Sequence, residues 1–151
     1  MDANGLTLSI CLRCRDGRET NTADLTQRGG RRLSRSVAEH FGDSAAAKLG
    51  VHLRGVNCMS QCKRPCAIAL SGPNRFTYLF GDLDPQQNAD DALSVAAAYA
   101  QSEDGFLERA QRPKVLQAGI LGRIPPLGFS GALVEPISHV FSEALKETDL
   151  P

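Results

Sequence analysis

The alternation of apolar and polar residues along the first half of the chain predicts a strand, a helix and a second strand. Residues 6–11 alternate Leu, Leu and Ile with Thr, Ser and Cys, which is typical of a strand with one buried face. Residues 30–49 carry apolar side chains at helical spacing, and Gly42-Asp43 is a point at which this helix can divide. Residues 51–56 predict the second strand.

The pattern continues with a hairpin and another helix. Residues 67–71 and 75–80 are apolar segments separated by a Ser-Gly-Pro-Asn turn, so they predict a β-hairpin. Residues 89–101 form an amphipathic helix whose first turn carries two acidic residues, where the helix dipole favours them. The expected order is β-α-β-β-β-α, which gives one α/β domain over residues 5–102.

The last part of the chain has a different character. Residues 112–135 contain Pro and Gly and show no sustained period, whereas residues 136–146 predict a helix. We expect residues 103–151 to form an extended C-terminal arm that packs on the domain or on a second subunit. In the second case the protein is a homodimer; a flexible tail is the alternative.

Composition and charge exclude several classes of protein. The chain has 151 residues, with 17 basic and 17 acidic side chains, and this length suffices to bury a core. No apolar stretch approaches the ~20 residues of a transmembrane helix, and the N-terminal residues lack the features of a signal peptide. Aromatic residues do not alternate with the arginines, as they do in many nucleic-acid-binding surfaces. We therefore expect a cytoplasmic protein that binds neither nucleic acid nor membranes.

The charges are distributed unevenly along the chain. Residues 1–75 hold 12 basic and 6 acidic side chains, whereas residues 76–108 hold 7 acidic side chains and no basic one. Four basic residues flank the cysteines: Arg13, Arg15, Lys63 and Arg64. We expect these cations to surround the cysteine loops and to attract an acidic partner protein, with the acidic segment 82–104 lying away from those loops.

Five cysteines carry the clearest chemical signal. Cys11 and Cys14 form a C-x2-C pair, and Cys58, Cys62 and Cys66 form a C-x3-C-x3-C run. The odd number argues against a framework of disulfides. Each group follows a predicted strand, and parallel strands of a β-α-β unit end at the same edge of the sheet, so the two groups can converge. Four thiolates from two loops can hold a zinc ion or an iron–sulfur cluster, and a C-x2-C pair can also act as a redox dithiol.

The run from Val56 to Pro65, followed by a hairpin and a helix, resembles the thioredoxin-like [2Fe-2S] ferredoxins. These proteins have two ligands after the first strand and a C-x3-C pair after the second. The sequence also resembles, over nearly its whole length, a bacterial family of predicted metal-binding proteins whose genes often lie near those of cobalamin biosynthesis. The features shared with that family are both cysteine runs, Tyr78, Gly81-Asp82-Leu83, Arg112-Pro113 and Arg123–Pro126.

The resemblance implies a thioredoxin-like fold that binds one [2Fe-2S] cluster. It further implies that the protein transfers single electrons to a redox partner protein, as a carrier or accessory subunit without a substrate pocket of its own, and it implies a link to cobalamin biosynthesis. The ligands that it indicates are Cys11, Cys14, Cys58 and Cys62, with Cys66 as a near neighbour or a substitute ligand. Two alternatives remain open: a zinc-binding module with four cysteines, and a thiol-based redox or metal-delivery protein that uses Cys62 or Cys66.

Overall fold

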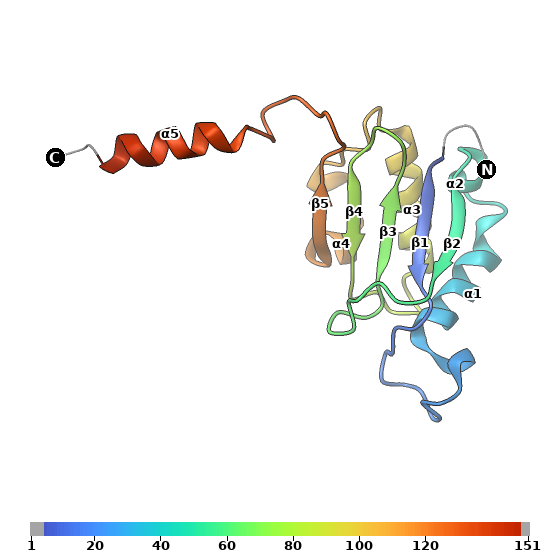
Figure 1. The fold of residues 1–151 in the computed structure, drawn as a ribbon. Helices are drawn as coiled ribbons and strands as arrows, with labels where there is room; N and C mark the ends of the chain where they lie inside the picture. The colour runs from blue at the N-terminus through green and yellow to red at the C-terminus, as the bar shows by residue number, and fades with distance from the viewer. Residues whose placement is uncertain (1–4, 149–151) are drawn as a thin grey trace.

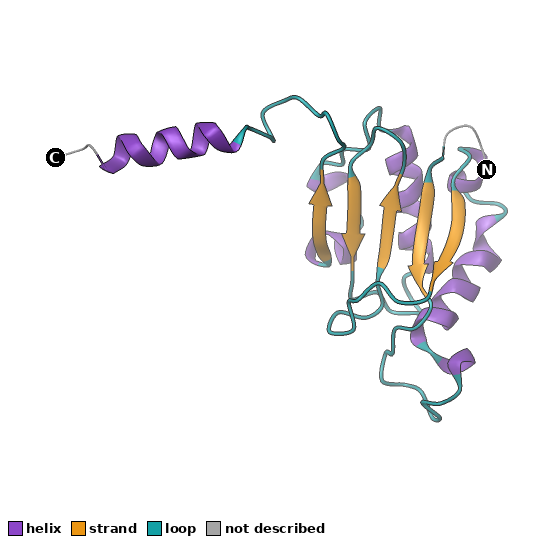
Figure 2. Ribbon diagram, viewed as in Figure 1, coloured by secondary structure: helices purple, strands orange, loops and turns teal. Residues whose placement is uncertain are grey.

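The computed structural model describes residues 5–148, which form a five-stranded mixed sheet, helices packed on one face of it, and a C-terminal helix that stands apart (Figures 1 and 2). The strands are β1 (Thr7–Cys11), β2 (His52–Val56), β3 (Ile68–Ser71), β4 (Thr77–Phe80) and β5 (Ile120–Ile124). The α-helices are α1 (Gly29–Phe41), α2 (Ala45–Lys48), α3 (Ala89–Gln101), α4 (Lys114–Ala118) and α5 (Ile137–Thr148). Two short 3-10 helices are η1 (Leu25–Gln27) and η2 (Arg109–Gln111).

The sheet has the strand order β2-β1-β3-β4-β5. β1 pairs in parallel with β2 on one side and antiparallel with β3 on the other, and β4 and β5 continue the antiparallel part. Cys11 is the register partner of Val56 in the parallel pair. The sheet therefore brings the carboxyl ends of β1 and β2 to one end of the molecule.

The core lies between the sheet and the helices α1, α3 and α4, which stand behind the sheet in the view of Figure 1. Leu8 and Ile10 of β1 are buried with Leu33 and Val37 of α1, which recur at the spacing of one helical face. The small residues of α3, such as Ala92 and Ala96, are buried in the same cluster.

The structure confirms the predicted α/β architecture and the elements of the first 101 residues. The long helical segment divides where expected, because Gly42 ends α1 and the Ser44 side chain caps α2 by accepting a hydrogen bond from the Ala47 N–H at 3.2 Å. The helix predicted after Pro136 is also present, as α5. Within residues 5–148, every helix falls short of the length and hydrophobicity that crossing a bilayer requires.

The segment after α3 differs from the expected arm, because it contains η2, α4 and a fifth strand. β5 pairs with β4, with Ile124 opposite Thr77, and so forms one edge of the sheet. The sequence of β5 is short and has a central glycine, so its pattern does not predict a strand; pairing with β4 imposes the conformation. The division of the chain at residue 102 stays a prediction.

Tyr78 of β4 fixes the segment after α3 to the core. Its buried hydroxyl accepts a hydrogen bond from the Leu107 N–H at 2.8 Å and donates one to the Leu107 carbonyl at 3.3 Å. Tyr78→Phe leaves this buried N–H without a partner, so we expect a loss of about 1–3 kcal/mol in the free energy of unfolding. Urea denaturation followed by circular dichroism measures this loss. A variant within 0.5 kcal/mol of the parent, as is usual for a surface substitution, would contradict this role of the hydroxyl.

Candidate metal centre

The sheet topology places the cysteines, because β1 lies between β2 and β3. The chain leaves β2 and has to pass the carboxyl end of β1 before it enters β3, and Figure 1 shows this crossing. Cys58, Cys62 and Cys66 all lie on the crossing segment, whereas Cys11 ends β1 and Cys14 follows in the next loop. The five cysteines therefore belong to two loops at the same end of the sheet.

Three of the cysteines form a buried group. Cys11 and Cys14 are each 3% exposed and Cys66 is fully buried. The Cys14 thiol is in hydrogen-bond contact with the thiols of Cys66 and Cys11. The backbone holds the group in place, because the Cys11 N–H donates to the Ala67 carbonyl at 3.0 Å and Cys66 exchanges two hydrogen bonds with Leu83 at 3.2 Å.

The other two cysteines, Cys58 and Cys62, are exposed on the crossing segment. The Ser60 N–H donates to the Cys58 sulfur at 3.4 Å, and the Met59 N–H is in hydrogen-bond contact with the Cys11 thiol. The crossing segment thus lies next to Cys11 at Met59, although Cys58 and Cys62 are exposed. Among the side chains of residues 5–142, no three His, Cys, Asp or Glu are arranged to hold a metal ion.

The contacts within the buried group shift the pKa values of its three thiols in different directions. Hydrogen bonds, above all the one with the Cys66 thiol, lower the pKa of Cys14 below its usual value. Burial of the thiol acts in the opposite direction. The shared hydrogen bond with Cys14 and burial both raise the pKa of Cys66, and burial raises the pKa of Cys11. Cys14 is therefore the member of this group that most readily becomes a thiolate, the form that binds metals.

Two glycines at the start of α1 bring the helix against the cysteines. A Cβ on Gly30 would lie 1.8 Å from the Cys11 carbonyl oxygen, and one on Gly29 would lie 3.0 Å from the Cys66 sulfur. The Gly30 N–H also donates to the Cys14 carbonyl at 3.0 Å. The sequence analysis gave these glycines no role. The feature that could have indicated one is a Gly-Gly pair at the start of a helix, where it allows close packing. The positive end of the helix dipole favours thiolates nearby.

Acidic residues are more numerous at this end than the sequence analysis predicted. Arg64 contacts Asp82, with its Nε 2.9 Å from Oδ2, and Arg18 contacts Asp84 at 2.8 Å. The expectation that the acidic segment lies away from the cysteine loops is therefore wrong for Asp82 and Asp84. The reason is that β4 runs in the same direction as β1, so the residues that follow it arrive at the cysteine end.

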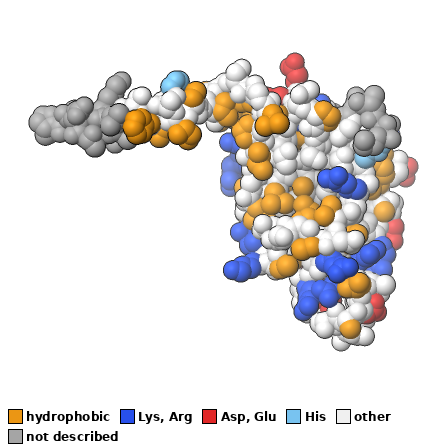
Figure 3. Space-filling model, in the orientation of Figure 1, with side chains coloured by type: hydrophobic (Ala, Val, Ile, Leu, Met, Phe, Trp, Pro, Cys, Tyr) orange, Lys and Arg blue, Asp and Glu red, His pale blue; other side chains and the backbone are white. Residues whose placement is uncertain are grey.

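The ion pairs leave a smaller basic surface than predicted. Arg13, Arg15 and Lys63 are exposed and make no ion pair with any residue of the described part of the chain, whereas Arg64 is neutralised by Asp82. Figure 3 shows basic side chains gathered toward this end of the molecule. We call Arg13, Arg15 and Lys63 the basic rim.

The comparisons with known proteins agree with this architecture. A solved structure of a thioredoxin-like [2Fe-2S] ferredoxin from Aquifex aeolicus is similar to the chain, with a TM-score of 0.50 and 14% sequence identity, and the match covers 85% of this chain and 100% of that chain. A 1.5 Å crystal structure of the wild-type ferredoxin from the same organism gives a TM-score of 0.48 and 14% identity over 80% of this chain and 99% of that chain.

The sequence comparisons identify the family. No protein with a curated description matches the chain. Residues 8–126 match the model of a family described as "Protein of unknown function (DUF1636)", and this segment includes all five cysteines and the whole sheet apart from Thr7. The chain has a thioredoxin-like fold and belongs to the DUF1636 family.

Proposed function

We propose that the protein binds one [2Fe-2S] cluster at the cysteine end of its sheet and carries single electrons to or from a redox partner protein. The observation that carries this proposal is the convergence of five cysteines from two loops at one end of a thioredoxin-like sheet. The proposed ligands are Cys11, Cys14, Cys58 and Cys62. Cys66 is proposed as a buried neighbour that contacts Cys14.

The donor set fits such a cluster, because thiolates are the ligands that iron–sulfur clusters prefer. Cys11 and Cys14 are held by backbone hydrogen bonds, and the crossing segment lies against Cys11. Since Cys58 and Cys62 are exposed, binding a cluster requires their thiols to turn toward the first pair. When bound, the cluster would supply one-electron chemistry.

The residues around the proposed ligands would set the properties of the centre. Burial of Cys11 and Cys14 lowers the local dielectric constant, and hydrogen bonds to the sulfurs together with the nearby basic rim favour the reduced, more negative state. Arg13, Arg15 and Lys63 would also meet a partner that approaches the cysteine end. The resemblance seen in the sequence supports a role linked to cobalamin biosynthesis.

One contact favours a second candidate. The thiols of Cys14 and Cys66 are hydrogen-bonded and the pKa of Cys14 is lowered, which suits a thiol-based redox protein. Burial of both thiols limits their access to another thiol or disulfide, so we rank this candidate below the cluster. A zinc-binding module would use the same four proposed ligands. Analysis of the bound metal distinguishes this alternative from the [2Fe-2S] cluster.

The cofactor is tested on freshly purified, anaerobically handled protein. We expect a brown protein with iron and acid-labile sulfide in equal amounts, two of each per chain, because four thiolates at one site match a single [2Fe-2S] cluster. Elemental analysis, sulfide determination and the visible spectrum measure this. Colourless protein with one zinc per chain would support the zinc-binding module, and metal-free protein with a Cys14–Cys66 disulfide would support the thiol-based candidate.

The ligand assignment is tested by single serine substitutions. Cys11→Ser, Cys14→Ser, Cys58→Ser and Cys62→Ser should each remove most of the cluster, because each loses one sulfur–iron bond. Cys66→Ser should retain the cluster and shift its spectrum, since it alters only a neighbour of Cys14. Ser60→Ala, an exposed substitution on the same crossing segment, is the matched control. If Cys66→Ser loses the cluster and Cys62→Ser retains it, the assignment is wrong: Cys66 is then the ligand and Cys62 is not.

The basic rim is tested by charge reversal. Arg15→Glu with Lys63→Glu should slow electron transfer to an acidic partner roughly tenfold at low salt, because exposed charges steer association. The difference should shrink as salt increases, since the Debye length falls to about 8 Å at physiological ionic strength.

Lys48→Glu provides the control for this experiment. Lys48 is an exposed cation on α2, which lies at the other end of the sheet (Figure 1), so its reversal should leave the rate unchanged. Stopped-flow kinetics against ionic strength provide the measurement. Equal rates for the rim and Lys48 variants would exclude docking at the basic rim, while the cluster spectrum reports separately on the cofactor.

A further inference from the structure

Helix α5 (Ile137–Thr148) stands away from the rest of the molecule, at the end of the linker 125–136 (Figure 1). Its apolar side chains are exposed: Ile137 at 79%, Val140 at 43% and Phe141 at 63%. The spacing of these three residues places them on one face of the helix. An isolated helix of 12 residues is marginally stable in water, so α5 needs a surface to pack against.

The linker makes its own contact with the body before α5 begins. Phe129 and Leu133 form one side of a pocket, and Phe129 packs edge-to-face on Phe76 with 5.0 Å between ring centroids. Pro125-Pro126 and Pro136 stiffen the two ends of the linker. The linker leads away from the sheet, so α5 lies apart from the pocket that its own linker helps to form (Figure 1).

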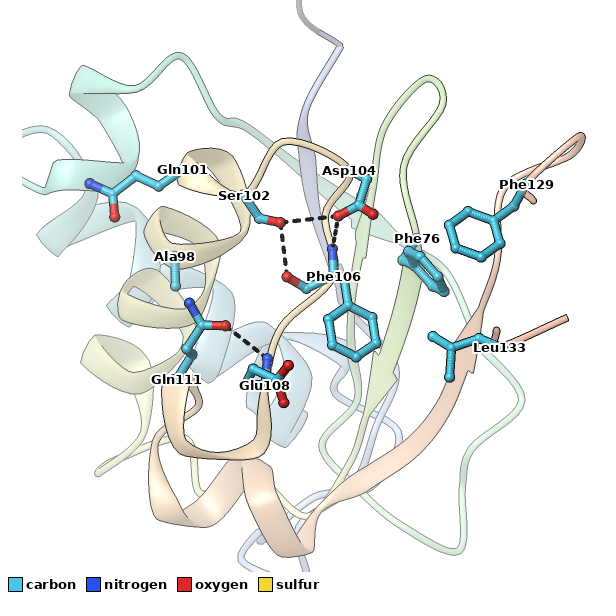
Figure 4. Close-up of a pocket in the computed structure, with 10 residues that line it drawn as sticks. All are labelled: Phe76, Ala98, Gln101, Ser102, Asp104, Phe106, Glu108, Gln111, Phe129 and Leu133. Atoms are coloured by element: carbon cyan, nitrogen blue, oxygen red, sulfur yellow. Dashed lines mark hydrogen bonds between the residues drawn. The ribbon is translucent and has the colours of Figure 1, made fainter. Parts of the chain in front are cut away.

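This pocket has the composition of a helix-binding site. Its volume is about 470 Å³, and it lies between the end of α3, the segment 102–108 and the linker (Figure 4). Phe106 packs edge-to-face on Phe76 at 5.4 Å, so aromatic rings form its apolar wall. Polar side chains, such as those of Gln101 and Glu108, also line the pocket. An apolar wall with a polar rim matches an amphipathic helix.

We propose that two copies of this chain form a dimer by exchanging α5, each helix placing Val140 and Phe141 in the pocket of the other copy. The chain itself carries both complementary surfaces, the unpartnered helix face and the aromatic pocket. Reciprocal exchange is a two-fold symmetric contact that closes on itself, which is the commonest form of protein dimer.

The size of the contact also favours reciprocal exchange. A helix of 12 residues is about 18 Å long, so a single docked helix covers less area than the ~1,200 Å² at the lower end of stable interfaces. Two exchanged helices with their linkers double that area. The helix lies beyond residues 8–126, which match the family, whereas most residues of the pocket lie within that segment.

Light scattering coupled to gel filtration tests this proposal on the full chain. We expect a dimer at micromolar concentration, and we expect Phe141→Glu to raise the dissociation constant at least tenfold because it places a charge in the apolar contact. His139→Glu, on the opposite face of α5, is the matched control and should change the dissociation constant less than twofold. Ala98→Trp tests the pocket without altering α5, since it fills the space between α3 and Phe106 and should also raise the constant at least tenfold.

Circular dichroism confirms that each variant is folded before its mass is compared. Three outcomes overturn the exchange: a full chain that stays monomeric with α5 docked on its own pocket, one that associates only with a different protein, and a dimer that survives removal of residues 137–151. Iron and sulfide content is measured on the same samples. Failure of the dimer proposal can therefore be distinguished from failure of the proposed function.

Discussion

The central position of β1 is the constraint on which the cysteine end of the molecule depends. Because β1 is flanked by parallel β2 and antiparallel β3, the segment that joins these two neighbours must cross the carboxyl end of β1. Hydrogen bonds fix both ends of this crossing, from Leu12 N–H to the Val56 carbonyl at 2.8 Å and from Cys11 N–H to the Ala67 carbonyl at 3.0 Å. Strand pairing therefore brings the two cysteine loops to the same end of the sheet, where Cys66 contacts Cys14.

The N-terminal end of α1 packs against the carboxyl end of β1 and covers the cysteine loops on the helical side of the sheet. Gly30 lies so near the Cys11 carbonyl that a side chain would collide with it, and the Gly29 N–H donates to the Glu19 carboxylate at 2.9 Å. Asp16 makes an ion pair with Arg32 of α1, which fastens the first cysteine loop to the helix. Burial of Cys14 and Cys66 follows from this packing, because α1 and the crossing segment enclose them together.

Much of the fold could be predicted from the sequence, because burial of one face leaves a clear period in segments such as 6–11 and 89–101. The position of both cysteine loops at one end of the sheet followed from the parallel pairing expected for a β-α-β unit. The fifth strand could not be predicted, since residues 120–124 become a strand only by pairing with β4. The contact of Cys66 with Cys14 was also outside the reach of sequence spacing, because it depends on how the crossing segment enters β3.

The structure separates its two proposed interaction surfaces along the direction of the strands. β1 ends at the cysteine loops, whereas Phe76, at the floor of the aromatic pocket, precedes β4 at the other end of the sheet. A redox partner that docks on Arg13, Arg15 and Lys63 would therefore not compete with an exchanged α5. Since electron transfer needs close approach only at the cysteine end, dimerisation through the opposite end would join two carriers while each keeps its basic rim accessible.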